Sequence, residues 1–200
     1  MGRRKLGTLT ITSYDKLVFL ALAKCHFITK DLATEYCHVG AKRLDRLERG
    51  GYLIRETAVV NDAFITVYRL SAEGQSYTKR NVDGVNKLYH GTGIRGAGHD
   101  LDLCRHFLTL PYEAQKAALV ESEITDTWGA GIKGYTSPPD MLIPEISIVL
   151  DNQTIYIPML IIESRTKNYS DEEIEAKERY VEQNIEVAKE VIHYVGVKKP

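Results

Sequence analysis

Residues 28–53 read ITKDLATEYCHVGAKRLDRLERGGYL, and this stretch decides how the first part of the chain folds. A threonine with capping character precedes a short helical pattern over residues 30–36. After a break, a second helical pattern follows over residues 41–49, and Gly50-Gly51 supplies a helix stop. The stretch therefore predicts two short helices joined by a tight turn.

The segments on either side extend this pattern. A wide apolar face predicts a longer helix over residues 14–24, capped by Ser13. Two β-rich segments at residues 53–60 and 63–70 are joined by the turn residues Asn61-Asp62 and predict a hairpin, and a further short helix follows to residue 80. Helix, short helix, turn, helix and hairpin resemble a winged helix-turn-helix domain, which places its third helix in the major groove of DNA.

The third predicted helix carries a basic face. Lys42, Arg46 and Arg49 are spaced i, i+4 and i+7, while Leu44 and Leu47 should face the core. The resemblance implies a DNA-binding surface made of Thr29, Lys30, Lys42, Arg43, Arg46, Arg49 and Arg55. Residues 1–80 also hold 14 Lys and Arg against 8 Asp and Glu, a balance of +6 that suits a phosphate backbone. A solvated helix face of mixed charge is the alternative interpretation.

Composition excludes several classes of protein. With 200 residues, 44% of them hydrophobic, and a net charge of −1, the chain has ordinary globular composition. No apolar run approaches the ~20 residues that span a bilayer, and the basic start lacks the apolar segment of a signal peptide, so we expect a cytoplasmic protein without a membrane partner. Cys25, Cys37 and Cys104 form no CxxC pair, and the histidines show no HExxH spacing, which disfavours zinc sites and a disulfide framework.

Residues 81–98 contain five glycines and predict a linker between a first domain at residues 1–80 and a second at residues 99–200. The second domain reads as a small α/β unit, so the predicted fold class is α+β. Its predicted elements are a helix at 100–118 kinked or split at Pro111, a β segment at 119–125, strands at 141–150 and 154–165, a helix from Ser170 to about residue 190, and a β segment at 191–197.

Two acidic residues in this second part have the spacing of a nuclease motif. Asp140 follows a proline, and 23 residues later Glu163 ends an apolar strand. Their order resembles the PD-(D/E)xK nuclease fold, which implies that Asp140 and Glu163 hold Mg²⁺ and that a lysine two residues after Glu163 helps to activate water. That position holds Arg165, which cannot act as a general base, and Lys167 on the same strand face is the candidate substitute. In the alternative interpretation, Asp140 caps a turn and Glu163 pairs with Arg165.

The whole chain resembles the replication-relaxation family of plasmids, phages and conjugative elements. The matching segments are residues 28–53, Gly98-His99-Asp100-Leu101, residues 121–128, Pro139-Asp140, Glu163-Ser164-Arg165 and residues 175–180. The resemblance implies a DNA-binding accessory factor that works on double-stranded DNA with a relaxase or replication initiator, and Arg165 fits a version without nuclease activity.

The sequence leaves open the function, the oligomeric state and the role of His99. The protein is an accessory factor, a metal-dependent endonuclease, or a transcriptional regulator whose second domain only dimerises or binds a partner. Because winged helices usually bind two half-sites, we expect a homodimer, with the helix at residues 172–190 as the candidate surface. His99 beside Asp100 is either a metal ligand or a hydrogen-bonding anchor for the start of its helix.

Overall fold

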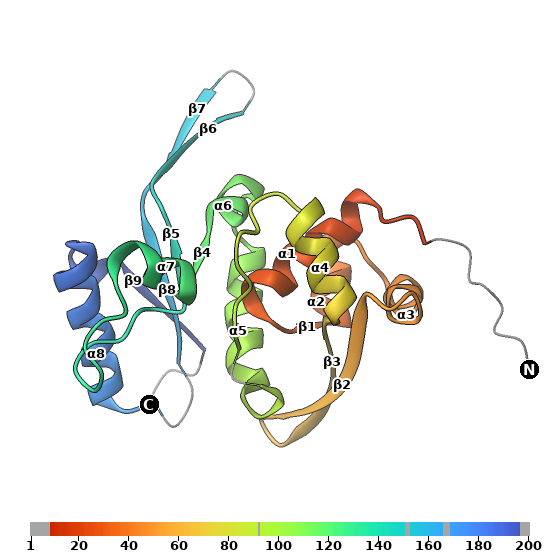
Figure 1. The fold of residues 1–200 in the computed structure, drawn as a ribbon, viewed down its shortest axis with the longest axis horizontal. Coiled ribbons are helices and arrows are strands. Elements are labelled where there is room, and N and C mark those ends of the chain that lie inside the picture. Colours follow the sequence, from red (N-terminus) through yellow and green to blue (C-terminus); the bar gives the residue numbers. More distant parts are fainter. Residues whose placement is uncertain (1–8, 92, 151–152, 166–168, 197–200) are drawn as a thin grey trace, which may run out of the picture.

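The first part of the chain folds as its hydrophobic pattern predicts (Figure 1). The computed structural model describes residues 9–91, 93–150, 153–165 and 169–196. The elements of the first part are α1 (Ser13–Cys25), β1 (Ile28–Thr29), α2 (Lys30–Cys37), α3 (Ala41–Arg49), β2 (Leu53–Val60), β3 (Ala63–Leu70) and α4 (Ala72–Asn81).

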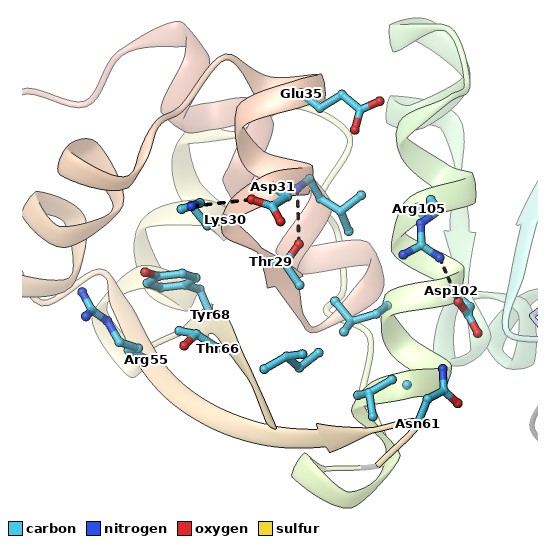
Figure 2. A pocket seen from close by; sticks show the side chains of 15 residues that line it. Thr29, Lys30, Asp31, Glu35, Arg55, Asn61, Thr66, Tyr68, Asp102 and Arg105 are labelled. Carbon is cyan, nitrogen blue, oxygen red and sulfur yellow. Dashed lines mark hydrogen bonds and ion pairs between the residues drawn. The ribbon is translucent and has the colours of Figure 1, made fainter. Parts of the chain in front are cut away.

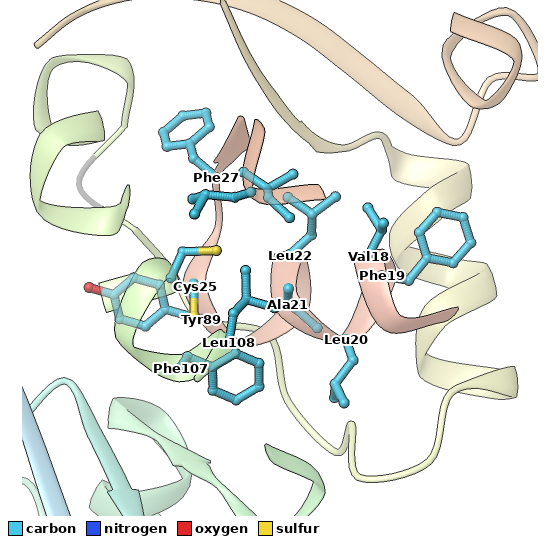
Figure 3. Close-up of a cluster of buried hydrophobic side chains, with 14 of the residues drawn as sticks. Val18, Phe19, Leu20, Ala21, Leu22, Cys25, Phe27, Tyr89, Phe107 and Leu108 are labelled. Carbon is cyan, nitrogen blue, oxygen red and sulfur yellow. The ribbon is translucent and has the colours of Figure 1, made fainter. Parts of the chain in front are cut away.

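Helix α1 is the centre of this part. Its N-cap is Thr12 and not the predicted Ser13, because Thr12 and Asp15 form a reciprocal capping box. Nine of its residues are buried, including a continuous run from Val18 to Cys25. Figure 3 shows the side chains of Val18, Phe19, Leu20 and Leu22 directed to different sides of the helix. A helix that is apolar all round must lie inside the molecule.

Strands β2 and β3 form the predicted hairpin, with β1 completing an antiparallel sheet of order β1-β3-β2. Asn61 and Asp62 both have positive φ, 50° and 63°, as a two-residue hairpin turn of matching twist requires. The turn residues in the sequence therefore predicted the hairpin correctly.

The second part is α+β, as predicted, although several of its elements differ from the prediction. A 3₁₀ turn at Ile94–Gly96 leads into this part. Its elements are α5 (Ala97–Leu108), α6 (Tyr112–Ala117), β4 (Leu119–Val120), α7 (Glu121–Trp128), β5 (Met141–Ile143), β6 (Ile146–Leu150), β7 (Gln153–Ile157), β8 (Leu160–Arg165), α8 (Asp171–Tyr180), a π-helical turn (Val181–Ile185), a 3₁₀ turn (Lys189–Val191) and β9 (Ile192–Gly196).

Local chemistry explains the differences in the β segments. The predicted β segment at 119–125 is wrong beyond Val120, because the Glu123 carboxylate accepts the Val120 N–H and starts a helix there. The strands predicted at 141–150 and 154–165 are each two strands, interrupted at Pro144 and Pro158. The helix predicted to about residue 190 leaves α-helical geometry after Tyr180. The helix predicted at 100–118 does split at Pro111.

The strands of the second part form two separate sheets. The order of the larger sheet is β4-β5-β8-β9, with β8 and β9 parallel and the other pairs antiparallel. Among the described strands, β6 and β7 pair only with each other, and they form a ribbon that extends away from the body (Figure 1). None of the described helices is long and apolar enough to cross a membrane.

The two parts share a core. Helix α5 packs against α1 on one side and against β8 and β9 on the other. Phe107 and Leu103 of α5 are fully buried in one hydrophobic cluster that also includes Leu22 of α1 and Ile162 of β8. Figure 3 shows Phe107 and Leu22 in this cluster. The division into domains at 1–80 and 99–200 stays a prediction, since the two parts bury apolar surface against each other.

Candidate nucleic-acid interface and carboxylate centre

Helix α3 presents the predicted basic face to solvent. Leu44 and Leu47 are fully buried, whereas Lys42, Arg46 and Arg49 on the opposite side are exposed. Within the described part of the chain, neither Lys42 nor Arg46 forms an ion pair, and Arg49 donates only to a backbone carbonyl of its own helix. These side chains are therefore free to reach an anionic partner.

Arg43 does not belong to this exposed face. Its guanidinium donates to both carboxylate oxygens of Asp15, at 2.8 Å for the Nε contact, and to the carbonyl of Thr10 at 2.6 Å. Burial would raise the pKa of Asp15, but the hydrogen bonds from Arg43 and Thr12 outweigh it and lower that pKa. Arg43 thus attaches α3 to the start of α1.

Arg55 also forms ion pairs within the chain and does not belong to the exposed basic face. Its guanidinium lies 2.6 Å from the Glu48 carboxylate, forms a second ion pair with Asp45, and stacks 5.5 Å from the centre of the Tyr68 ring. It joins β2 to α3, and it neutralises the acidic side of α3 that faces the hairpin.

Thr29, Lys30 and Arg55 line a cleft of about 670 Å³ between α2, the sheet and α5 (Figure 2). The hydroxyl of Thr29 accepts from a backbone N–H at the start of α2, and exposed Lys30 lies 3.7 Å from Asp31. Of the seven residues predicted to bind DNA, the structure brings only Lys42, Arg46 and Arg49 together on a free face.

Asp140 and Glu163 lie side by side, as their resemblance to a nuclease motif implied. Antiparallel pairing of Met141 with Ile162 places the end of the loop before β5 against the end of β8. The backbone N–H of Asp140 donates to the Glu163 carboxylate at 3.0 Å, and the N–H of Ser164 donates to Asp140 at 2.9 Å. Both side chains are buried, and we refer to them and the groups that contact them as the carboxylate centre.

Sequence reasoning missed the cation that belongs to this centre, Lys177 of α8. Its Nζ lies 3.1 Å from the Glu163 carboxylate and donates to the carbonyl of Pro138 at 2.6 Å. The Tyr169 hydroxyl donates to the same carboxylate oxygen of Glu163. Helical spacing could have indicated Lys177, because it lies three residues before the buried Tyr180 and so shares its inward face.

Arg165 takes no part in the centre. Its guanidinium stacks over the Tyr194 ring at 5.0 Å, so the alternative in which Glu163 pairs with Arg165 is wrong; Glu163 pairs with Lys177. Lys167, the proposed substitute base, lies outside the described residues.

His99 completes the centre and connects it to the first part of the chain. Its Nε2 lies 3.1 Å from Asp140, and its Nδ1 lies 3.1 Å from Asp100. The other oxygen of Asp100 lies 3.0 Å from Nδ1 of His26, at the end of α1. The hydroxyl of Ser164 also donates to the backbone carbonyl of His99. His99 thus holds the start of α5 against β8, as the anchoring interpretation predicted.

The titratable groups of this centre shift one another's pKa values. Burial alone would lower the pKa of His99, but hydrogen bonds to Asp100 and Asp140 raise it to about 10, so the imidazole is a cation at neutral pH. Burial and the neighbouring Asp140 carboxylate raise the pKa of Glu163 to about 7, against the effect of Lys177. His99 is therefore the cation beside Asp140 and Asp100, whereas Lys177 lies beside a Glu163 carboxyl that is only partly ionised at neutral pH.

The two predicted ligands do not fit Mg²⁺ in this arrangement. Among the described residues, no group of three or more histidine, cysteine or acidic side chains is placed to hold a metal. All four carboxylate oxygens of Asp140 and Glu163 accept hydrogen bonds from protein groups. The donors are Tyr89, His99, Tyr169, Lys177 and the backbone N–H groups of Asp140 and Ser164.

The comparisons with known proteins identify no relative. No family model matches the chain, and neither the curated proteins nor the solved structures contain a match.

Proposed function

We propose that this chain is a DNA-binding accessory protein of a plasmid, phage or conjugative element, which acts in replication, relaxation or DNA transfer without cutting DNA. In this proposal, residues 1–80 form a winged helix-turn-helix. The second part is a PD-(D/E)xK-like domain in which protein groups already contact the oxygens of Asp140 and Glu163. The mobile-element setting rests on the resemblance to the replication-relaxation family, and a relaxase or replication initiator is the proposed protein partner.

The free basic face of α3 is the observation that carries the proposal. Lys42 and Arg46 are exposed without ion pairs in the described structure, and Leu44 and Leu47 anchor the opposite side of the helix in the core. A rigid helix with outward cations next to a β-hairpin suits insertion into a major groove. A homodimer would place two such helices on half-sites about 34–36 Å apart.

The contacts of Asp140 and Glu163 support the proposal that the protein does not cut DNA. Each carboxylate already has a buried cationic partner, and Arg165 points to Tyr194 instead of the centre. The three cysteines are buried and free, which fits the reducing cytoplasm included in the proposal.

A mobility-shift assay with the full-length chain tests the DNA contact. We expect Lys42→Ala/Arg46→Ala to weaken binding to a duplex at least about tenfold, because two phosphate contacts are lost, and to reduce the salt slope by ~1 for each contact. Lys79→Ala/Arg80→Ala removes the same charge from exposed positions of α4 and serves as the matched control. Equal weakening by both variants would show only a general charge effect and would contradict the assignment of α3.

A nicking assay tests the absence of cleavage. We expect supercoiled plasmid to stay intact with wild-type protein and Mg²⁺ or Mn²⁺, because the Asp140 and Glu163 oxygens are occupied by protein donors. Metal-dependent nicking that disappears in Asp140→Ala and Lys177→Ala would refute this part of the proposal and favour the endonuclease alternative.

A further inference from the structure

Helix α1 ends in an unusual backbone turn centred on His26. His26 has φ 69° and ψ −53°, and the N–H of Phe27 donates to the carbonyl of Cys25 at 2.9 Å. These angles and this hydrogen bond define a γ-turn of the positive-φ form, which is rare and strained. His38 and Glu186 also have positive φ, but their ψ values of 30° and 36° place them in the ordinary left-handed region.

Contacts of the His26 side chain hold this turn. Its Nδ1 lies 3.0 Å from the completely buried carboxylate of Asp100 in α5, and its ring packs on the ring of Phe27 with 4.0 Å between centroids. Gly91 covers the contact, because a Cβ at that position would overlap both the Asp100 carboxylate and Nδ1 of His26. A strained backbone persists only where its surroundings fix it, and here a residue of the second part of the chain does so.

The turn sets the direction in which the chain enters the proposed DNA-binding helices. Phe27, Ile28 and Thr29 are the residues between His26 and the start of α2. Phe27 and Ile28 are buried, and Ile28 pairs with Tyr68 in the hairpin sheet. Helix α2 leads through a short turn into α3, which carries the free basic face. A change of backbone at His26 would therefore shift β1 and both helices together.

Asp100 also connects the turn to the carboxylate centre. Its other oxygen lies 3.1 Å from Nδ1 of His99, and Nε2 of His99 lies 3.1 Å from Asp140. His26, Asp100, His99 and Asp140 thus form a continuous polar chain from the end of α1 to the residue before β5. Coupling between two regions requires an element with two arrangements that both regions can bias. The strained turn supplies such an element, because releasing its strain gives a second arrangement.

We propose that the γ-turn at His26 is a latch, which Asp100 keeps closed and which positions α2 and α3, so that a contact made by the second part of the chain sets the affinity for DNA. When the contact between His26 and Asp100 is lost, the turn relaxes, β1 shifts and DNA binding weakens. The inference rests on the proposed DNA contact of α3. His26 acts as a positioning residue, since it lies at the end of α1 and not on the basic face.

Two substitutions at His26 separate the latch from a simple loss of contact. His26→Ala and His26→Gly both remove the imidazole, but only glycine adopts positive φ without strain. In a mobility-shift assay with the full chain, we expect His26→Ala to raise the Kd for duplex DNA at least about tenfold and His26→Gly to stay within about threefold of wild type. Glu186→Ala and Glu186→Gly, at an exposed residue with φ 61°, are the matched controls and should both leave the Kd unchanged.

Hydrogen exchange gives a second readout that does not depend on DNA. We expect β1 to exchange at least about tenfold faster in His26→Ala than in wild type, with little change in His26→Gly. Exchange in β8 should stay as in wild type, because only a general loss of stability would accelerate it there as well. A wild-type chain that does not bind DNA would refute the proposed function, and the exchange pattern would still test the latch.

Gly91→Ala tests the role of Asp100 without removing either partner of the contact. Because the added Cβ would push Asp100 and His26 apart, we expect this variant to weaken DNA binding and accelerate exchange in β1 as His26→Ala does. Equal Kd values for His26→Ala and His26→Gly, with melting temperatures confirming that both are folded, would overturn the latch. Wild-type behaviour of Gly91→Ala in both assays would show that Asp100 does not keep the turn closed and would equally contradict the proposal.

Discussion

At the scale of single residues, the carboxylate centre shows how burial decides the role of a side chain. Asp140 and Glu163 occupy positions that resemble magnesium ligands, yet each lies beside a buried basic side chain of the same chain. Removing one member of a buried ion pair typically costs about 3–5 kcal/mol, because the remaining charge stays buried without compensation. The centre is therefore expected to hold the second part together.

The raised pKa of His99 leads to a prediction about pH. Its folded-state pKa of about 10 lies above the ordinary value of 6.5, so its stabilisation is complete below pH 6.5 and is lost as the pH rises toward 10. We expect the free energy of unfolding, measured with urea, to fall between pH 6.5 and 9.5 by a few kcal/mol more in wild type than in His99→Gln. His90→Gln, at an exposed position, should behave as wild type. Parallel curves for wild type and His99→Gln would contradict the assigned role of His99.

At the scale of secondary-structure elements, the prediction succeeded where helix stops and turn residues mark the boundaries, and it failed where a side-chain cap starts a helix in a segment predicted as β. Helix α3 begins and ends at the predicted residues, and the hairpin turn is at Asn61-Asp62. The segment at 119–125 contains Val120, Ile124 and Thr125, which favour a strand. However, the Glu123 carboxylate accepts a hydrogen bond from the Val120 backbone nitrogen at 3.0 Å and stabilises a helix start instead. Such side-chain caps decide between helix and strand over only a few residues.

Long-range ion pairs decide which cations an element leaves free. The spacing of α3 places Arg43 beside the basic face, but Arg43 reaches 28 residues back to Asp15, and Arg55 reaches back to Asp45 and Glu48. The partners lie on different elements, so no periodicity within α3 could have revealed them.

At the scale of the whole molecule, α1 and α5 form a common core for both parts, and this leads to a prediction about cooperativity. Phe107 is fully buried where α5 meets α1. We expect Phe107→Ala to lower the free energy of unfolding by about 3–5 kcal/mol. Hydrogen exchange should then accelerate in β2–β3 and in β8 alike, because both rest on the same cluster.

Arg105→Ala, at an exposed position on the same helix, is the control and should change neither region. Faster exchange confined to the second part in Phe107→Ala would indicate that the two parts unfold independently, as the predicted domain boundary implies.

The sequence by itself determined the order of elements in the first 80 residues, the basic face of α3 and the spacing that brings Asp140 beside Glu163. The first two depend on caps, turns and periodicity within short segments, and the third rests on the resemblance of Pro139-Asp140 and Glu163-Ser164-Arg165 to a nuclease motif. Tertiary structure alone decided that Lys177 from α8 pairs with Glu163, that Asp100 contacts both His26 and His99, and that β6 and β7 pair with no other described strand. Each of these depends on contacts between residues far apart in the chain or on the absence of a neighbouring strand in the described structure, and local pattern carries no information about either.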